Sequence, residues 1–224
     1  MRYVIGIDEV GRGSLAGPVV VAACLLPRGK RIGKRGLGTL KDSKKLSAKQ
    51  REQWNAYLRA HPKIHFAVAR VNPRGIERMN VSRAANLASM RACMRLLDHR
   101  KIASGKIRIF LDGGLYLGPH RGLTQIETRI GADKKNIRVY LRRNLRVSAT
   151  TVIRGDEKYH AVKAASIIAK VHRDRFMVKL AKKYPEYGFE MHKGYGTKAH
   201  FAAIRRHGPS AVHRLTFLKK FYRV

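Results

Sequence analysis

The sequence is poor in acidic side chains, since only 14 of its 224 residues are Asp or Glu against 49 Lys and Arg. The resulting formal net charge of +35 produces a strong field that attracts polyanions. Nucleic acid is therefore the leading partner class. Adaptation to an unusual solvent and a basic surface without a specific ligand are the alternatives.

Cysteine and long apolar runs are also scarce. Cys24 and Cys93 are the only cysteines, lie far apart in apolar surroundings and form no C-x-x-C pair, which argues against a disulfide framework or a zinc site. They are interpreted as buried thiols in a reducing compartment. The longest apolar run, "VVVAACLLP", is too short to span a bilayer, and the N-terminus lacks a signal-peptide layout. We expect a soluble, cytoplasmic protein.

The chain has enough apolar residues for one sizeable core, because 44% of it is hydrophobic. Runs of β-forming residues predict strands over residues 2–8, 19–27, 63–72, 106–114 and 144–156. Apolar spacing predicts a helix over residues 75–100. Ser47 is a plausible cap for a helix over 48–60, and residues 157–184 are strongly helical in character. Residues 28–47 read as a loop, and the closing part as a glycine-containing loop and two short basic helices. The order indicates an α/β or mixed α/β domain.

The few acids are placed unusually. Asp8, Glu9, Asp112 and Asp156 all fall at predicted strand ends, at or beside glycine. Acids that converge at one edge of a sheet repel one another unless a cation neutralises them. Carboxylates without Cys or paired His suit Mg²⁺ or Mn²⁺, and four of them can hold two divalent ions for phosphoryl chemistry. The alternative is that each acid caps a helix or pairs with one of the many basic residues.

Several motifs resemble a known family. "GIDEVGRGSLAGPVVVAA" (6–23) is similar to the opening motif of ribonuclease HII, the type 2 ribonuclease H. Its remaining signatures are matched in order by "LKDSKKLS" (40–47), "FLDG" (110–113), "RGDEKYHAVKAASIIAKVHRDR" (154–175) and "HKGYGTKAH" (192–200). The related ribonuclease HIII is disfavoured by the "GRG" at residues 11–13 and by the seven residues that precede Asp8.

The resemblance implies a ribonuclease H-like fold: a mixed five-stranded sheet flanked by helices, with a helical C-terminal extension. We place the catalytic domain at residues 1–184 and the extension at 185–224. The implied activity is two-metal-ion cleavage of RNA in RNA:DNA hybrids and incision 5′ to single ribonucleotides in duplex DNA, leaving 5′-phosphate and 3′-hydroxyl ends. The implied catalytic and metal-binding residues are Asp8, Glu9, Asp112 and Asp156.

Asp174 is an alternative fourth ligand. It lies far along a predicted helix, so an ion pair with Arg173 or Arg175 is the preferred interpretation.

Substrate contacts are also implied by the resemblance. Gly11, Arg12 and Gly13 would let the backbone approach the sugar and its 2′-OH, although a lone G-x-G is otherwise only a tight turn. Tyr195 would stack on the sugar beside the ribonucleotide. Phosphate contacts are suggested for four residues, although a solvated face is the usual role of such lysines: Lys44, Lys45, Ser166 and Lys170.

Other functions remain open from the sequence. A non-catalytic basic RNA- or DNA-binding protein has no use for clustered acids, and an integrase- or resolvase-type nuclease is not expected to combine "GRG" with "KGYGT". Leu218, Phe221 and Tyr222 have the spacing of the end of a sliding-clamp-binding peptide. Leu215 stands where such peptides carry glutamine, so a helix that packs on the domain is the favoured interpretation. We expect a monomer.

Overall fold

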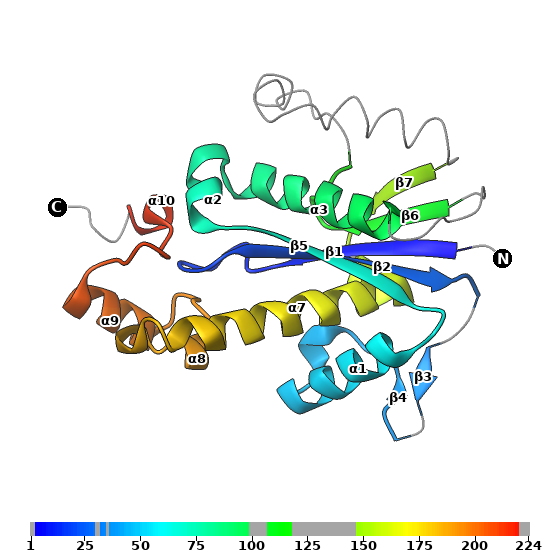
Figure 1. Ribbon diagram of the computed structural model, residues 1–224, viewed down its shortest axis with the longest axis horizontal. Coiled ribbons are helices and arrows are strands. Elements are labelled where there is room, and N and C mark those ends of the chain that lie inside the picture. The colour runs from blue at the N-terminus through cyan, green and yellow to red at the C-terminus, as the bar shows by residue number, and fades with distance from the viewer. Residues whose placement is uncertain (1–2, 30–31, 35, 99–106, 118–146, 220–224) are drawn as a thin grey trace.

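A mixed five-stranded sheet forms the centre of the molecule (Figure 1). The structure is a computed structural model that describes residues 3–29, 32–34, 36–98, 107–117 and 147–219. The sheet order is β5-β2-β1-β6-β7. The strands are β1 (Tyr3–Val10), β2 (Val19–Pro27), β5 (His65–Val71), β6 (Ile107–Asp112) and β7 (Val147–Val152). β1, β2 and β5 pair antiparallel, whereas β1, β6 and β7 pair parallel, which confirms the expected mixed sheet.

Helices cover both faces of the sheet. α3 (Val81–Asp98) lies over one face, while α7 (His160–Ala181) and α1 (Ala48–Ala60) lie on the other (Figure 1). Separate apolar clusters fill the two interfaces. β2 contributes to both clusters and is buried along nearly its whole length, as a near-continuous apolar run on a central strand requires.

Gly6 sets how closely α7 approaches β1. A Cβ atom at Gly6 would lie 2.1 Å from the backbone carbon of Ala161, so only glycine fits there. Alanines continue the close contact along α7, including Ala164 and Ala165, both fully buried. Helix and strand therefore meet almost backbone to backbone, two residues before Asp8.

The C-terminal part is helical and packs around a third apolar cluster. Its elements are η2 (Pro185–Tyr187), α8 (Phe189–His192), α9 (Lys198–His207) and α10 (Leu215–Leu218). Leu218 is buried in this cluster, which agrees with the packing interpretation of α10. Phe221 and Tyr222 lie outside the described residues. Within the described ranges, no helix combines the length and apolarity needed to cross a membrane.

Three predicted elements need correction. The expected loop 28–47 contains a small hairpin, β3 (Gly33–Lys34) with β4 (Gly38–Thr39), and the 3₁₀ turn η1 (Ser43–Lys45). The expected helix 75–100 is two helices, α2 (Pro73–Met79) and α3. Asn80 separates them with a φ of 66°, a left-handed conformation that Asn tolerates better than most residues.

The predicted helix 157–184 is also divided. A short helix, α6 (Gly155–Lys158), precedes α7, and extended backbone at Tyr159 separates the two. Asp156 therefore belongs to a helix rather than to a strand end. β1 continues to Val10, so Asp8 and Glu9 lie inside this strand, two positions and one position before its end.

Candidate active site

Three carboxylates from three different elements meet beside the sheet. Asp8 comes from β1, Asp112 from the end of β6 and Asp156 from α6, and each offers one oxygen such that these oxygens lie within 4.8 Å of one another. The parallel register pairs Ile7 with Leu111, so the next position along each strand brings Asp8 beside Asp112. Three of the four predicted acids thus converge.

Asp8 is buried and firmly oriented. Its Oδ1 accepts a hydrogen bond of 2.8 Å from the backbone N–H of Glu9, and the hydroxyl of Ser166 on α7 also hydrogen-bonds the carboxylate. Burial raises the pKa of Asp8 well above its usual range, and the negative charges of Glu9 and Asp112 raise it further. A buried charge beside like charges is favourable only when a cation is present.

A glycine holds Asp112 in place. The backbone N–H of Gly155 donates to Asp112 Oδ1 over 2.6 Å, and a Cβ at Gly155 would lie 3.3 Å from the same oxygen. Arg154 before it has a φ of 55°, a conformation that costs a non-glycine residue on the order of 1 kcal/mol. Burial raises the pKa of Asp112, and the charge of Asp156 adds to the effect. The strained turn places Gly155 and Asp156 against the end of β6.

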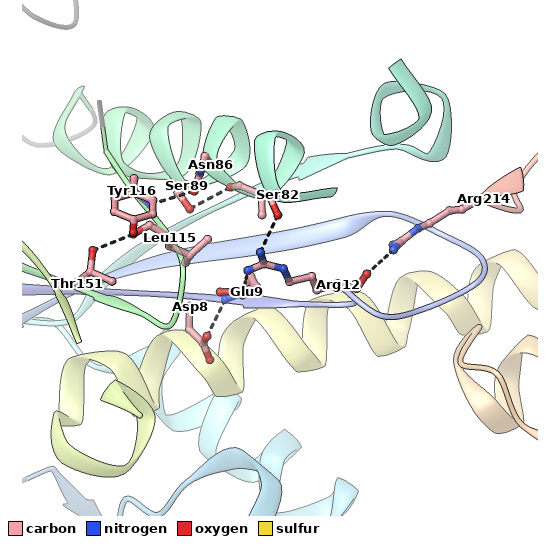
Figure 2. Close-up of polar contacts among 11 residues, drawn as sticks. Asp8, Glu9, Arg12, Ser82, Asn86, Ser89, Leu115, Tyr116, Thr151 and Arg214 are labelled. Atoms are coloured by element: carbon pink, nitrogen blue, oxygen red, sulfur yellow. Dashed lines mark hydrogen bonds and ion pairs between the residues drawn. The ribbon is translucent and has the colours of Figure 1, made fainter. Parts of the chain in front are cut away.

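Glu9 lies on the other side of β1 from Asp8 because side chains alternate along a strand. Figure 2 shows Asp8 directed toward α7 and Glu9 directed with Arg12 toward α3. Arg12 Nη1 contacts Glu9 Oε1 at 3.3 Å, and its Nη2 donates to Ser82 at 2.8 Å. Burial raises the pKa of Glu9, although Arg12 opposes the shift. Glu9 Oε2 is buried and finds no hydrogen-bond partner among the described residues.

Lys44 reaches the acid cluster from η1. Its Nζ lies 3.0 Å from Asp156 Oδ2, and this hydrogen bond raises the pKa of Lys44. Asp42 caps the turn by accepting from the Lys44 N–H, and Ser43 hydrogen-bonds Ser166 at 2.8 Å. Ser166 is therefore buried beside Asp8 rather than at the surface, whereas Lys45 is exposed.

Asp174 lies outside the cluster, and its predicted ion pair with Arg173 or Arg175 is wrong. Asp174 Oδ2 pairs with Lys170 at 3.9 Å, one helical turn away on α7. Arg175 pairs with Glu52 on α1 instead. Burial lowers the pKa of Lys170.

Arg214 and Arg173 hold the loop that carries the "GRG" residues. Arg214 donates to the carbonyls of Gly11, Arg12 and Gly17 over 2.7–3.1 Å. Figure 2 shows it reaching Arg12 from the C-terminal part. Both arginines are fully buried.

Gly11 owes its identity to this packing. It has a φ of 82°, and a Cβ there would lie 2.1 Å from Nε of Arg173. Its carbonyl is bound by Arg214, whereas Gly13 is exposed and a Cβ there would meet no described atom within 4 Å. Of the two glycines, only Gly13 lies open to solvent.

Tyr195 lies in a loop packed directly on the same segment. The backbone N–H groups of Leu15 and Ala16 donate to the Gly194 carbonyl at 2.8 and 3.2 Å. Arg173 links the two loops by donating to the carbonyls of Ala16 and Lys193, and its guanidinium carbon lies 5.2 Å from the centre of the half-buried Tyr195 ring. The two loops that were singled out from the sequence thus form one structural unit.

No pattern in the sequence indicates that Arg173 and Arg214 are important. They are two of 49 basic residues, and their role depends on backbone carbonyls that carry no sequence signature. Position 214 is also about 200 residues distant from the carbonyls it binds.

The family model and the curated relatives indicate one family. The model of the family described as Ribonuclease HII matches residues 5–220. A Ribonuclease HII of Chlamydia pneumoniae is 40% identical over 214 residues, covering 96% of this chain and 82% of that protein. The crystal structure of the ribonuclease H2 from Pyrococcus horikoshii OT3 is similar with a TM-score of 0.64 and 26% identity, covering 99% of this chain and 100% of that one.

A second solved structure is similar in fold. The RNase HII of Archaeoglobus fulgidus, solved in a PCNA:RNase HII complex, gives a TM-score of 0.63 at 24% identity and covers 95% of this chain and 93% of that one.

Proposed function

The chain belongs to the ribonuclease HII family, which makes it a ribonuclease H hydrolase of RNA:DNA hybrids, and we propose that it also incises duplex DNA 5′ to a single embedded ribonucleotide. The observation that carries the proposal is the convergence of Asp8, Asp112 and Asp156 within 4.8 Å in a chain whose formal net charge is +35. A protein that only binds phosphates has no use for such a cluster.

The acid cluster fits divalent metal ions. Its donors are carboxylate oxygens, which suit Mg²⁺ or Mn²⁺. A bound cation would lower the raised pKa values of Asp8 and Asp112. The buried Glu9 Oε2 has no hydrogen-bond partner within the described ranges. We assign Asp8, Asp112 and Asp156 as ligands and propose Glu9 as the fourth, with two ions bound. Such ions supply an activated water and stabilise the leaving oxygen of an in-line displacement.

The residues around the ligands orient them for hydrolysis. Ser166 and the Glu9 N–H fix Asp8, the Gly155 N–H fixes Asp112, and Arg12 holds Glu9. Lys44 neutralises part of the charge on Asp156 and lies where it could contact a phosphate of the substrate. Water attack on phosphorus with cleavage of the P–O3′ bond leaves a 5′-phosphate and a 3′-hydroxyl end.

Recognition of the ribonucleotide is assigned to the paired loops. We propose that the backbone at Arg12 and at the exposed Gly13 contacts the 2′-OH and that Tyr195 stacks on the adjoining sugar. Gly11 contributes by letting Arg173 pack beneath the loop.

Phosphate contacts are proposed for Lys45, Lys170 and a basic cavity of about 350 Å³. The cavity follows β6 on the face that carries Asp112, because Arg108 and Phe110 precede it at two-residue intervals. Among the described residues, its wall includes Arg28 and Lys158 and no acid.

A clamp partner is a separate proposal. The Archaeoglobus fulgidus protein was solved in complex with PCNA, but at 24% identity this similarity shows only the fold. In this chain Leu218 is buried, and the aromatic pair that would complete the peptide lies outside the described residues. Deleting residues 217–224 and measuring clamp binding by pull-down would test it.

Cleavage assays on three duplexes test the main proposal: one with a single embedded ribonucleotide, one long RNA:DNA hybrid and one all-DNA control. We expect cleavage of the first two with Mg²⁺ or Mn²⁺ and none with EDTA. Asp112→Asn should lower kcat more than about 100-fold, since changes even to the partners of metal ligands cost about 10–100-fold. Duplex binding should persist because the basic surface is unchanged.

Asp174→Asn is the matched control, because it removes an acid outside the cluster and should leave cleavage within a few-fold of the parent. Near-normal kcat at saturating metal for Asp8→Asn, Asp112→Asn and Asp156→Asn would refute the metal assignment. Binding without cleavage of either RNA-containing duplex would favour the non-catalytic alternative.

A further inference from the structure

Two buried histidines lie beneath the loop that carries Tyr195. His200 on α9 and His213 after it are 0% and 3% exposed, and their Nε2 atoms lie 3.1 Å apart. They form no part of the acid cluster, and the described residues contain no group of three metal-ligating side chains that includes them. Their contacts indicate a different task.

The hydrogen-bond partners fix the tautomer of each ring. The backbone N–H of Ser210 can only donate, so His213 Nδ1 accepts from it at 3.0 Å and the proton of His213 lies on Nε2. The Tyr195 carbonyl can only accept, so His200 Nδ1 donates to it at 3.0 Å and its Nε2 is the acceptor. The two assignments, made from opposite ends, agree at the central contact, where His213 Nε2–H donates to His200 Nε2.

A continuous directional chain therefore runs from the Ser210 N–H through two neutral imidazoles to the carbonyl of Tyr195. Burial lowers the pKa of both histidines to about 4, consistent with neutral rings. The Tyr195 carbonyl also accepts from the Thr197 N–H at 2.8 Å, and the Tyr195 N–H donates to the backbone carbonyl of His192 at 3.0 Å. The backbone of Tyr195 is thus held from several directions.

The same chain is tied to the "GRG" loop. His213 forms an isolated β-bridge with Ala16, and the neighbouring Arg214 binds the carbonyls of Gly11 and Arg12. His192 stacks on His200 with ring centres 4.2 Å apart and donates through Nε2 to the Tyr187 carbonyl at 2.8 Å. A shift of the His200–His213 pair would therefore move Tyr195 relative to the loop it faces.

We propose that His200 and His213 are positioning residues that set selectivity for a single embedded ribonucleotide by fixing Tyr195 against the "GRG" loop. The inference rests on the proposed junction-reading role of Tyr195. A single ribonucleotide offers one junction, so a misplaced ring lowers its cleavage fully. A long hybrid offers many sites at which the sugar beside the cut is also RNA, so it depends less on this contact.

The test compares two substitutions of His200. His200→Phe keeps a buried ring but removes the donor to Tyr195, whereas His200→Asn retains an N–H near the position of Nδ1. We expect His200→Phe to lower kcat/KM for the single-ribonucleotide duplex about 10-fold more than for the long hybrid, the size expected for losing one buried hydrogen bond. His200→Asn should recover most of the difference.

Thermal melts accompany the assays, which are run well below the lowest melting temperature. A purely structural role predicts equal losses on both substrates and no better performance by Asn than by Phe, and either result overturns the proposal. If His200→Phe does not fold, the same comparison is made at His213, the preceding residue of the hydrogen-bond chain. His213→Gln can still donate a hydrogen bond near the position of Nε2, whereas His213→Leu cannot.

Tyr195→Ala and the double variant Tyr195→Ala/His200→Phe separate the inference from its premise. Equal losses on both substrates for Tyr195→Ala would refute the junction-reading role itself. A selective loss for Tyr195→Ala without one for His200→Phe would refute only the positioning role. We expect the double variant to be no more selective than Tyr195→Ala, because residues that act through one another are not additive.

Discussion

The carboxylate of Asp8 is buried beside Asp112 and Asp156, so its negative charge destabilises the folded protein when no cation is bound. Its raised pKa means that the folded protein holds a proton there more tightly than the unfolded chain does. The corresponding stability is present below the ordinary pKa of aspartate and is lost as the pH rises through the raised value. Metal binding would replace the proton as the source of neutralisation.

We therefore expect Asp8→Asn to raise the melting temperature of the metal-free protein at neutral pH while it abolishes cleavage. Asparagine mimics the neutral acid at every pH, and each kcal/mol gained corresponds to about 2–4 °C for a chain of this size. Calorimetry in EDTA measures the effect, with Asp174→Asn as a control outside the cluster. A lower melting temperature for Asp8→Asn would show that the negative charge stabilises the fold even without metal.

At the scale of single residues, the sequence predicted the roles of the rare acids but not those of the more common polar side chains around them. Acids are so few that four of them at predicted strand ends were informative, and three converge. Ser166 was predicted as a phosphate contact, yet its hydroxyl is buried between Ser43 and Asp8. Nothing in a pattern of polar residues on a helix tells which one faces the sheet at the position of an acid.

At the scale of elements, the approach of α7 to β1 determines whether the site forms. α7 carries Ser166 to Asp8, and the preceding α6 carries Asp156. Gly6 permits this approach because a Cβ atom at this position would overlap the backbone at Ala161.

Gly6→Ala is expected to destabilise the protein by about 1–3 kcal/mol or more and to lower cleavage even where it remains folded. The obstacle is helix backbone at 2.1 Å, which cannot rotate away as a side chain would, and overpacking of this kind costs about 1–3 kcal/mol or more. Urea unfolding and cleavage assays measure both effects. Gly13→Ala is a control for the unfolding measurement, because a Cβ there would meet no described atom within 4 Å and Gly13 does not have a positive φ. Equal stability of Gly6→Ala and the parent would show that α7 can move away freely.

The packing of α8 and α9 depends on neutral histidines. His200 and His213 have pKa values lowered to about 4 by burial, and burial also lowers that of His192. A lowered folded pKa means that the unfolded chain binds the proton more tightly, so stability is complete above the ordinary histidine pKa of about 6.5 and falls as the pH drops toward 4.

Melting temperatures should accordingly decline between about pH 6.5 and pH 4 in the parent protein. The decline should be shallower in His200→Asn, which removes one of the titrating rings. The acid cluster acts in the opposite direction, since its raised pKa values favour the folded state at low pH. Comparison of the parent with His200→Asn isolates the histidine contribution, and identical slopes for the two would contradict it.

Elements were predictable where their pattern is local. The cap at Ser47 and the strand over Val19–Pro27 depend on neighbouring residues and were confirmed. The break at Asn80 was missed because apolar spacing continues across it, and a single left-handed residue leaves the periodicity almost unchanged. The division at Tyr159 was also missed, because one residue in an extended conformation separates two segments that each favour helix.

At the scale of the whole molecule, the fold brings a few acids together in a chain that is otherwise strongly basic. The acid cluster is local, whereas the 49 basic residues recur along the sequence and give the chain its net positive charge. The fold was predictable because its motifs occur in a fixed order along the chain. The coupling of the "GRG" loop to Arg214, nearly the whole chain length away, was not predictable.

Affinity for duplexes should fall steeply with salt. Each phosphate that the protein neutralises releases counterions, so the logarithm of the binding constant falls against the logarithm of salt concentration with a slope near −0.9 per contact on B-DNA. Six or more contacts would weaken binding by about 10³-fold or more between 50 and 200 mM salt. Fluorescence anisotropy in EDTA measures binding without cleavage.

The double variant Arg108→Gln/Lys158→Gln should reduce the slope by about 2 if the cavity along β6 binds phosphates, because two cations are removed from its wall. Arg175→Gln is the matched control, since this arginine pairs with Glu52 on the surface. An unchanged slope in the double variant would place the nucleic acid elsewhere, and a flat salt dependence in the parent would mean that the basic surface does not contact the phosphate backbone.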